Sequence, residues 1–133
     1  MTREYKIECI IVGTIMNNSV CNDYYNECRF IITDDMFADE FHKKIYRAVK
    51  KIWESGMKYI SPLEVFQEIG GTPETAYNLC VLSSEFHFEY MKYVFNRNER
   101  HKINGKPNLT RIQFVDYIKQ FVKNYGKTLH NRS

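Results

Sequence analysis

The chain has 133 residues, which is enough for one domain with a real hydrophobic core and too few for two such domains. Its hydrophobic content of 44% and charged content of 26% are typical of a soluble globular protein, and its net charge is only +3. Aromatic residues reach 15%, so we expect a core rich in aromatic rings.

The cysteines and the N-terminal apolar run limit the possible class further. Cys9, Cys21, Cys28 and Cys80 form no Cys-x-x-Cys pair, which argues against structural zinc and favours buried free thiols in a reducing cytoplasm. The apolar run CIIVGTIM, residues 9–16, has no cleavage pattern after it and is far shorter than the roughly 20 residues that cross a bilayer. A cytoplasmic protein without a membrane segment is therefore expected.

Apolar residues recur at helical spacing through nearly the whole chain. The first expected helix spans about residues 4–17, and a short aromatic one spans about 19–28. A third carries Phe41 and Ile45 on its apolar face and ends at Gly56, where a C-terminal glycine belongs.

Two capping signals predict the next helices. SPLE at 61–64 and TPET at 72–75 each place a hydroxyl residue before a proline, and SPLE reads as a capping box. Two longer helices are expected over about 85–100 and 110–125, joined by the turn NGKPN. The predicted class is all-α: a compact bundle over 1–84, an antiparallel helical hairpin over 85–126 that lies away from it, and a tail over 127–133.

Carboxylates gather where the third helix begins, at Asp34, Asp35, Asp39 and Glu40. Acidic residues are favourable at the positive end of the helix dipole, and Asp39 with Lys43, like Glu40 with Lys44, would form acid-first i,i+4 pairs. The alternative is a metal held by Asp35, Asp39 and His42. Because this cluster contains only one histidine, we prefer the capped, solvated helix and expect no metal or other cofactor.

Several short motifs fall in one order and spacing over about residues 4–100. They are ECIIVGTIM (8–16), DMF (35–37), His42, IY (45–46), ESG (54–56), Ile60, GG (70–71) and YNL (77–79). Together these motifs resemble the N-terminal domain of DnaB-type replicative DNA helicases. Each motif is weak alone, and it is their joint order that carries the resemblance.

The resemblance implies roles for particular residues. Gly13 would be where another helix packs closely, Phe37 would fill the core, and His42 would be a hydrogen-bonded packing residue. The implied signature of the fold comprises Glu8, Gly13, Asp35, Phe37, His42, Ile45 and Gly56. It also implies a domain without catalytic residues, since the family's ATPase motor lies downstream of this domain.

No catalytic motif is convincing. FVKNYGKT, residues 121–128, ends like a phosphate loop but lacks its first glycine and a preceding strand, so it is expected to be helical and to bind no nucleotide. Ser83 and Ser84 near His87 lack the glycine-flanked turn of a nucleophile, and a helix end and restart is expected there.

Two functions remain. The first, which we favour, is an interaction domain that associates with copies of itself and docks a primase or helicase loader during DNA replication. The second is a small basic helical module that binds nucleic acid directly. The candidate surface for either partner comprises Tyr90, Tyr93, Arg97, Arg100, Lys102, Lys106, Arg111 and Tyr117.

The two halves of the chain differ in charge. Residues 1–91 hold nine Lys/Arg against fourteen Asp/Glu, whereas residues 92–133 hold ten against two. Such asymmetry indicates that the basic half meets something acidic. The acidic half of a neighbouring subunit and a protein partner are both compatible with it, and both are preferred to DNA.

Overall fold

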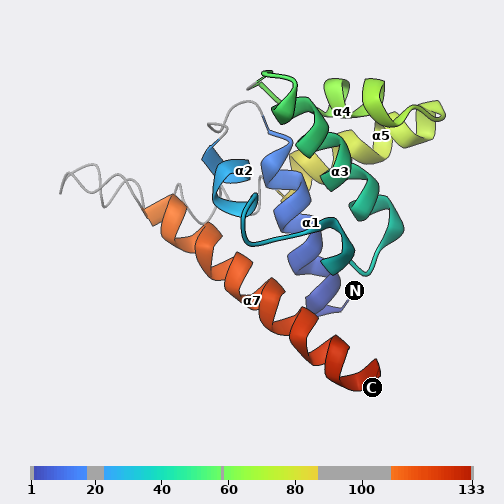
Figure 1. The fold of residues 1–133 in the computed structure, drawn as a ribbon. Coiled ribbons are helices and arrows are strands. Elements are labelled where there is room, and N and C mark those ends of the chain that lie inside the picture. Colours follow the sequence, from blue (N-terminus) through green and yellow to red (C-terminus); the bar gives the residue numbers. More distant parts are fainter. Residues whose placement is uncertain (1, 18–22, 58, 87–108, 133) are drawn as a thin grey trace.

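The computed structural model describes residues 2–17, 23–57, 59–86 and 109–132, and in the last helix it describes side chains from 114 to 127. The described residues are helical and include no strand, which confirms the all-α prediction. The main helices are α1 (Arg3–Ile15), α2 (Asp23–Cys28), α3 (Glu40–Glu54), α4 (Pro62–Ile69), α5 (Pro73–Val81) and α7 (Leu109–Arg132) (Figure 1). Two single turns, η1 (Asp34–Met36) and η2 (Leu82–Phe86), complete the set.

Helix α1 is the centre of the molecule. It contacts α2, α3, η2 and α7, and every residue from Ile7 to Ile15 is buried. The apolar run over residues 9–16 is thus part of the core helix. Since it is surrounded, α1 needs no polar face over this stretch, which explains why its apolar run is continuous.

Local sequence signals fix most helix ends. Asp39 caps α3 by accepting a hydrogen bond from the His42 amide at 3.0 Å, and Gly56 follows α3 with φ of 97°, a conformation that glycine adopts without strain. The Thr72 hydroxyl accepts from the Thr75 amide, and the Thr75 hydroxyl accepts from the Thr72 amide, so TPET forms a capping box.

Three local predictions were wrong. Ser61 makes no side-chain bond to the backbone of α4, because its hydroxyl donates to the Glu64 carboxylate instead. Within the described residues, Ser83 and Ser84 do not mark the end of one helix and the start of another, since both lie inside the π turn η2, which follows α5 directly. The acidic residues are also divided: Asp34 and Asp35 lie in the separate turn η1, and only Asp39 and Glu40 lie at the start of α3.

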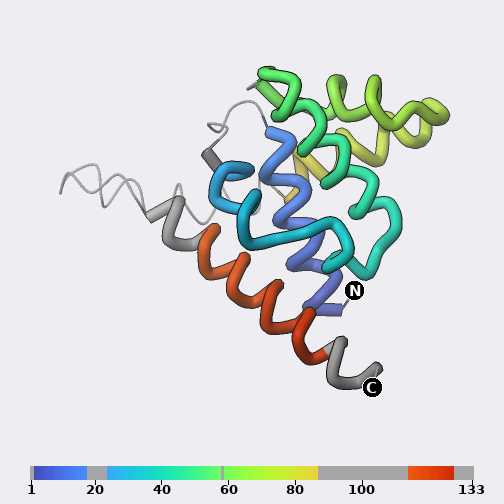
Figure 2. The backbone as a smooth tube through the Cα atoms, in the orientation of Figure 1, coloured from blue at the N-terminus to red at the C-terminus, as the bar shows by residue number. Residues whose placement is uncertain are grey.

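Helix α7 runs past Tyr125, where the prediction ended it, to Arg132, so the expected tail from residue 127 is helical through 132. It was predicted to belong to a hairpin that lies away from the bundle. Its apolar stripe packs on α1 and α2, so α7 is part of the bundle (Figure 2). Phe114, Ile118 and Phe121 are buried in the common core. Residues 87–108 lie outside the described part, so the predicted helical hairpin is not described.

Aromatic rings join α7 to the rest, as the ring-rich composition indicated. The Phe121 ring lies 4.7 Å from that of Phe37, centroid to centroid, and the Phe114 ring meets Tyr24 edge-on at 5.0 Å. Two polar links support them, from the Arg3 guanidinium to the Gln120 side-chain oxygen at 3.0 Å and from the Tyr125 hydroxyl to Asp35 at 3.4 Å. These contacts therefore agree with α1 and α2 as the main helical partners of α7, with a further link to η1 through Asp35.

Candidate functional site: a buried polar network between α1 and α3

Glu8 and His42 form the principal polar contact of the interior. Glu8 lies on α1 and is 5% exposed, and His42 lies in the first turn of α3 and is 1% exposed. His42 Nδ1 is 2.9 Å from Glu8 Oε1. Two residues from the resemblance, 34 positions apart in the chain, are thereby brought into direct contact.

The Glu8 carboxylate also holds the backbone that leads into α3. Its Oε2 accepts from the Ala38 amide at 3.1 Å, and its Oε1 accepts from the Asp39 amide at 3.4 Å. These amides precede the helix and have no partner within it. One buried side chain thus satisfies two backbone donors and a histidine, which is how a polar group is kept inside a core.

The other ring nitrogen of His42, Nε2, lies 3.7 Å from Cys9 Sγ. Burial raises the pKa of the Cys9 thiol to about 12, so the thiol stays protonated, and its sulfur lies within the distance of a weak hydrogen bond to this nitrogen. With Nδ1 donating to Glu8, each polar atom of the His42 ring has a partner.

Cys9, His42 and Glu8 follow the order of a cysteine–histidine–carboxylate triad, and the structure argues against that chemistry. Cys9 is buried, and a thiol with a raised pKa is a poor nucleophile because the thiolate is the reactive form. The ring centroids of Tyr5 and Phe37 lie 5.2 Å and 6.5 Å from that of the imidazole. The network holds α1 to α3.

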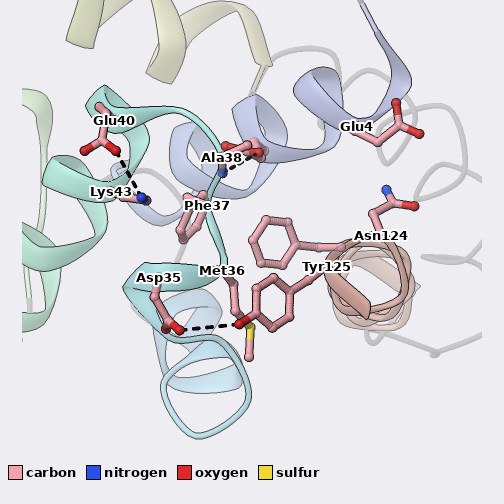
Figure 3. Close-up of a pocket in the computed structure, with 11 residues that line it drawn as sticks. Glu4, Asp35, Met36, Phe37, Ala38, Glu40, Lys43, Asn124 and Tyr125 are labelled. Atoms are coloured by element: carbon pink, nitrogen blue, oxygen red, sulfur yellow. Dashed lines mark hydrogen bonds and ion pairs between the residues drawn. The ribbon is translucent and has the colours of Figure 1, made fainter. Parts of the chain in front are cut away.

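Beside the network lies a cleft of about 180 Å³ between α1, η1, α3 and α7 (Figure 3). Its lining includes four carboxylates, from Glu4, Glu8, Asp35 and Glu40, and most of them are engaged. Asp35 accepts from Thr33 and Tyr125, and Glu40 pairs with Lys43 at 3.0 Å. In the described part of the chain, no three His, Cys, Asp or Glu side chains are placed to hold a metal ion.

A family model for the DnaB-like helicase N-terminal domain matches residues 1–84. The chain belongs to this family. The match contains both partners of the buried pair and every element from α1 to α5, and it ends inside η2. No match was found among curated proteins or among solved structures.

The remaining signature residues of this DnaB-like domain have structural positions. Phe37 and Ile45 are buried in the core. A Cβ built on Gly13 would lie 2.3 Å from the Leu82 carbonyl oxygen, so only glycine lets α1 and η2 approach this closely. Asp35 lies on the surface in η1, and Gly56 ends α3.

The predicted partner surface is mostly not described. Tyr90, Tyr93, Arg97, Arg100, Lys102 and Lys106 lie outside the described residues, as does the side chain of Arg111. Tyr117 is partly buried against the core, so it is not a free aromatic anchor. The sequence did not predict that Tyr117 is partly buried, because aromatic residues on a helix have the same spacing whether they face a partner or the core.

Two further predictions need correction. Lys43 pairs with Glu40 at i,i+3, and the carboxylate of Asp39 is used as the cap of α3, so neither predicted i,i+4 pair forms. Among the described thiols, Cys9 and Cys28 are free and buried as expected, but Cys80 on α5 is exposed. Cys21 lies outside the described residues.

The ending GKT, which resembled a phosphate loop, lies inside α7. Helical backbone at 126–128 does not form the open, glycine-rich turn that cradles phosphates. The described helices also include none long and apolar enough to span a membrane.

Proposed function

We propose that this chain is a non-catalytic protein-interaction domain of a replicative-helicase-like protein, which associates with copies of itself and docks a primase or a helicase loader. The observation that supports this most is the family match, because it covers the whole arrangement of α1 to α5. The interior supports it as well. Its buried polar pair, Glu8 and His42, joins α1 to α3.

The surface offers apolar side chains suited to docking. Tyr59, Leu63 and Tyr77 are strongly exposed, the first just before α4 and the others on α4 and α5, which pack together. Single exposed apolar residues are normal, but aromatic residues on rigid helices are typical anchors of interfaces. The sequence analysis did not identify these three residues as exposed, because apolar residues at helical spacing are equally compatible with core positions.

The test is to measure self-association by sedimentation over a concentration series and to titrate the purified primase and loader. Leu63→Asp/Tyr77→Asp should weaken one of these interactions at least tenfold. Gln67→Asp, an exposed change on α4, is the matched control. A chain that stays monomeric and binds neither protein would refute the proposal.

The absence of catalysis is tested separately. No ATP hydrolysis is expected, and ATP should not raise the melting temperature. ATP-dependent stabilisation that disappears in Lys127→Ala would contradict this. Salt-sensitive, sub-micromolar DNA binding that Arg97→Glu/Arg100→Glu abolishes would favour the alternative, direct binding of nucleic acid by the basic segment.

A further inference from the structure

A second cleft, of about 320 Å³, lies on the outer side of the molecule between α2, η1 and α3. Its charged lining is dominated by cations. They are Arg29, Arg47, Lys50 and Lys51, set against the carboxylates of Asp34 and Glu54. Lys44 continues the basic face of α3 toward α4, where it lines a neighbouring hollow with Arg47 and Lys51.

Only part of this positive charge is compensated. Arg47 is hydrogen-bonded to Asp34, and Lys51 pairs with Glu68 at 2.6 Å. For Arg29 and Lys50, both exposed, no carboxylate of the described residues lies within ion-pair distance. Two cations are therefore available to an external anion at the same cleft.

An exposed aromatic group stands next to these cations. Phe30 is 82% exposed, and the Arg29 guanidinium lies 4.4 Å from the centre of its ring. The same guanidinium lies 5.9 Å from the Trp53 ring, which in turn packs on Tyr25. A guanidinium stacked on aromatic rings presents planar surfaces on which another planar group, such as a base, can stack.

We propose that this cleft binds single-stranded nucleic acid, with a base stacked on Phe30 and phosphates held by Arg29 and Lys50. Proteins that hold single strands combine a basic groove with aromatic platforms, because every base has a flat face and every nucleotide a negative charge. Duplex DNA is a poorer fit, since paired bases are not free to stack on a side chain. A protein partner fits the lysines less well, because Lys is depleted at the centres of protein interfaces, although Arg and aromatic residues are enriched there.

The cleft is distinct from the surface of α4 and α5, and nucleic-acid binding in it does not rest on the docking of a primase or loader. The nucleic acid would then lie on the α2–α3 side and not on the basic segment over 92–111. Binding is expected to be weak and independent of sequence, with a dissociation constant of about 1–100 μM at physiological salt.

The experiment uses fluorescence anisotropy with labelled oligo-dT and oligo-rU, and with a duplex of the same length, at several salt concentrations. Arg29→Glu/Lys50→Glu should remove most of the binding to both single strands. The residual log–log salt slope should fall by roughly 1.4, about 0.7 for each phosphate that the variant no longer binds. Phe30→Ala should weaken binding by roughly tenfold with little change in the slope.

Lys119→Glu/Lys123→Glu is the matched control. It makes the same change in net charge on exposed positions of α7, and it should leave binding within about twofold. All three variants change exposed side chains, and a thermal melt of each confirms folding. Equal weakening by the control, equal affinity for the duplex, or loss of binding only in Arg97→Glu/Arg100→Glu would each overturn the proposal.

Discussion

The polar side chains on the inner face of α3 are buried and hydrogen-bonded, whereas those on its outer face are exposed and only partly paired. On the inner face, His42 is buried and each ring nitrogen has a partner, in Glu8 and Cys9. On the outer face, Lys50 has no acidic partner within the described residues, and Arg47 and Lys51 make ion pairs in solvent.

The difference follows from the cost of burial. A buried polar group without a partner costs several kcal/mol, so the inner face must be satisfied for the fold to form. An exposed charge is solvated by water, so the outer face is free to vary and to serve a ligand. The inner face thus specifies the fold, and the outer face is where function is to be sought.

The largest effect is expected for Glu8→Ala. The change leaves the His42 ring and the amides of Ala38 and Asp39 without their buried acceptor, which should lower the free energy of unfolding by roughly 3–5 kcal/mol. Urea denaturation followed by circular dichroism measures it. Glu8→Gln keeps an acceptor oxygen and should cost less, about 1–2 kcal/mol. A loss below about 1 kcal/mol in Glu8→Ala would contradict the statement that the buried polar groups of the inner face are needed for the fold.

Gly13→Ala should come next. The added methyl group meets the Leu82 backbone, which cannot move aside as a flexible side chain would, so a loss of about 1–3 kcal/mol is expected. Gly126→Ala is the matched control. It is also a helical glycine, but it has open space around it, and alanine there should stabilise by up to about 1 kcal/mol. The same sign for both variants would contradict the close contact.

The next effect concerns the N-cap residue of α3, Asp39, which is partly buried. Asp39→Ala removes a cap that the His42 amide uses and should cost about 1 kcal/mol in the free energy of unfolding. Ser61→Ala, at the equivalent position of α4, should cost less than about 0.5 kcal/mol because Ser61 makes no cap bond to the backbone. Equal losses in chemical denaturation would mean that the Ser61 hydroxyl caps α4 in solution.

The smallest effect is expected on the outer face. The hydrogen bond from Arg47 lowers the pKa of Asp34 below its ordinary value of 3.8. A carboxyl whose folded pKa is depressed stabilises the protein above its unfolded-state pKa, and the contribution is lost as the pH falls through the folded value. The difference in urea midpoint between the wild type and Asp34→Asn should therefore be present at pH 7 and shrink below about pH 4.

Because both side chains are exposed, this difference should be smaller than that of any interior variant. Arg47→Gln removes the same pair from the other side and should show the same pH dependence. A difference that persists at pH 2 would mean that Asp34 stabilises the fold by another route.

The sequence by itself determined the helical class and most helix positions, and it marked Glu8 and His42 as signature residues without pairing them. Apolar spacing, Gly56 and the motif over 72–75 are local signals, and local signals are readable because a helix satisfies its own backbone. The resemblance to the family predicted packing roles for Gly13 and His42 and marked Glu8. Helical periodicity alone predicts none of these.

Only the tertiary structure decided what each amphipathic face packs against. The stripe of α7 fits a hairpin partner and the bundle equally well in sequence, and the position of Phe37 opposite Phe121 shows that the bundle is its partner. Tyr117 and Phe30 could not be sorted into core and surface for the same reason. Burial depends on which elements meet, and residues 84 positions apart in the chain, such as Phe37 and Phe121, meet only once the chain has folded.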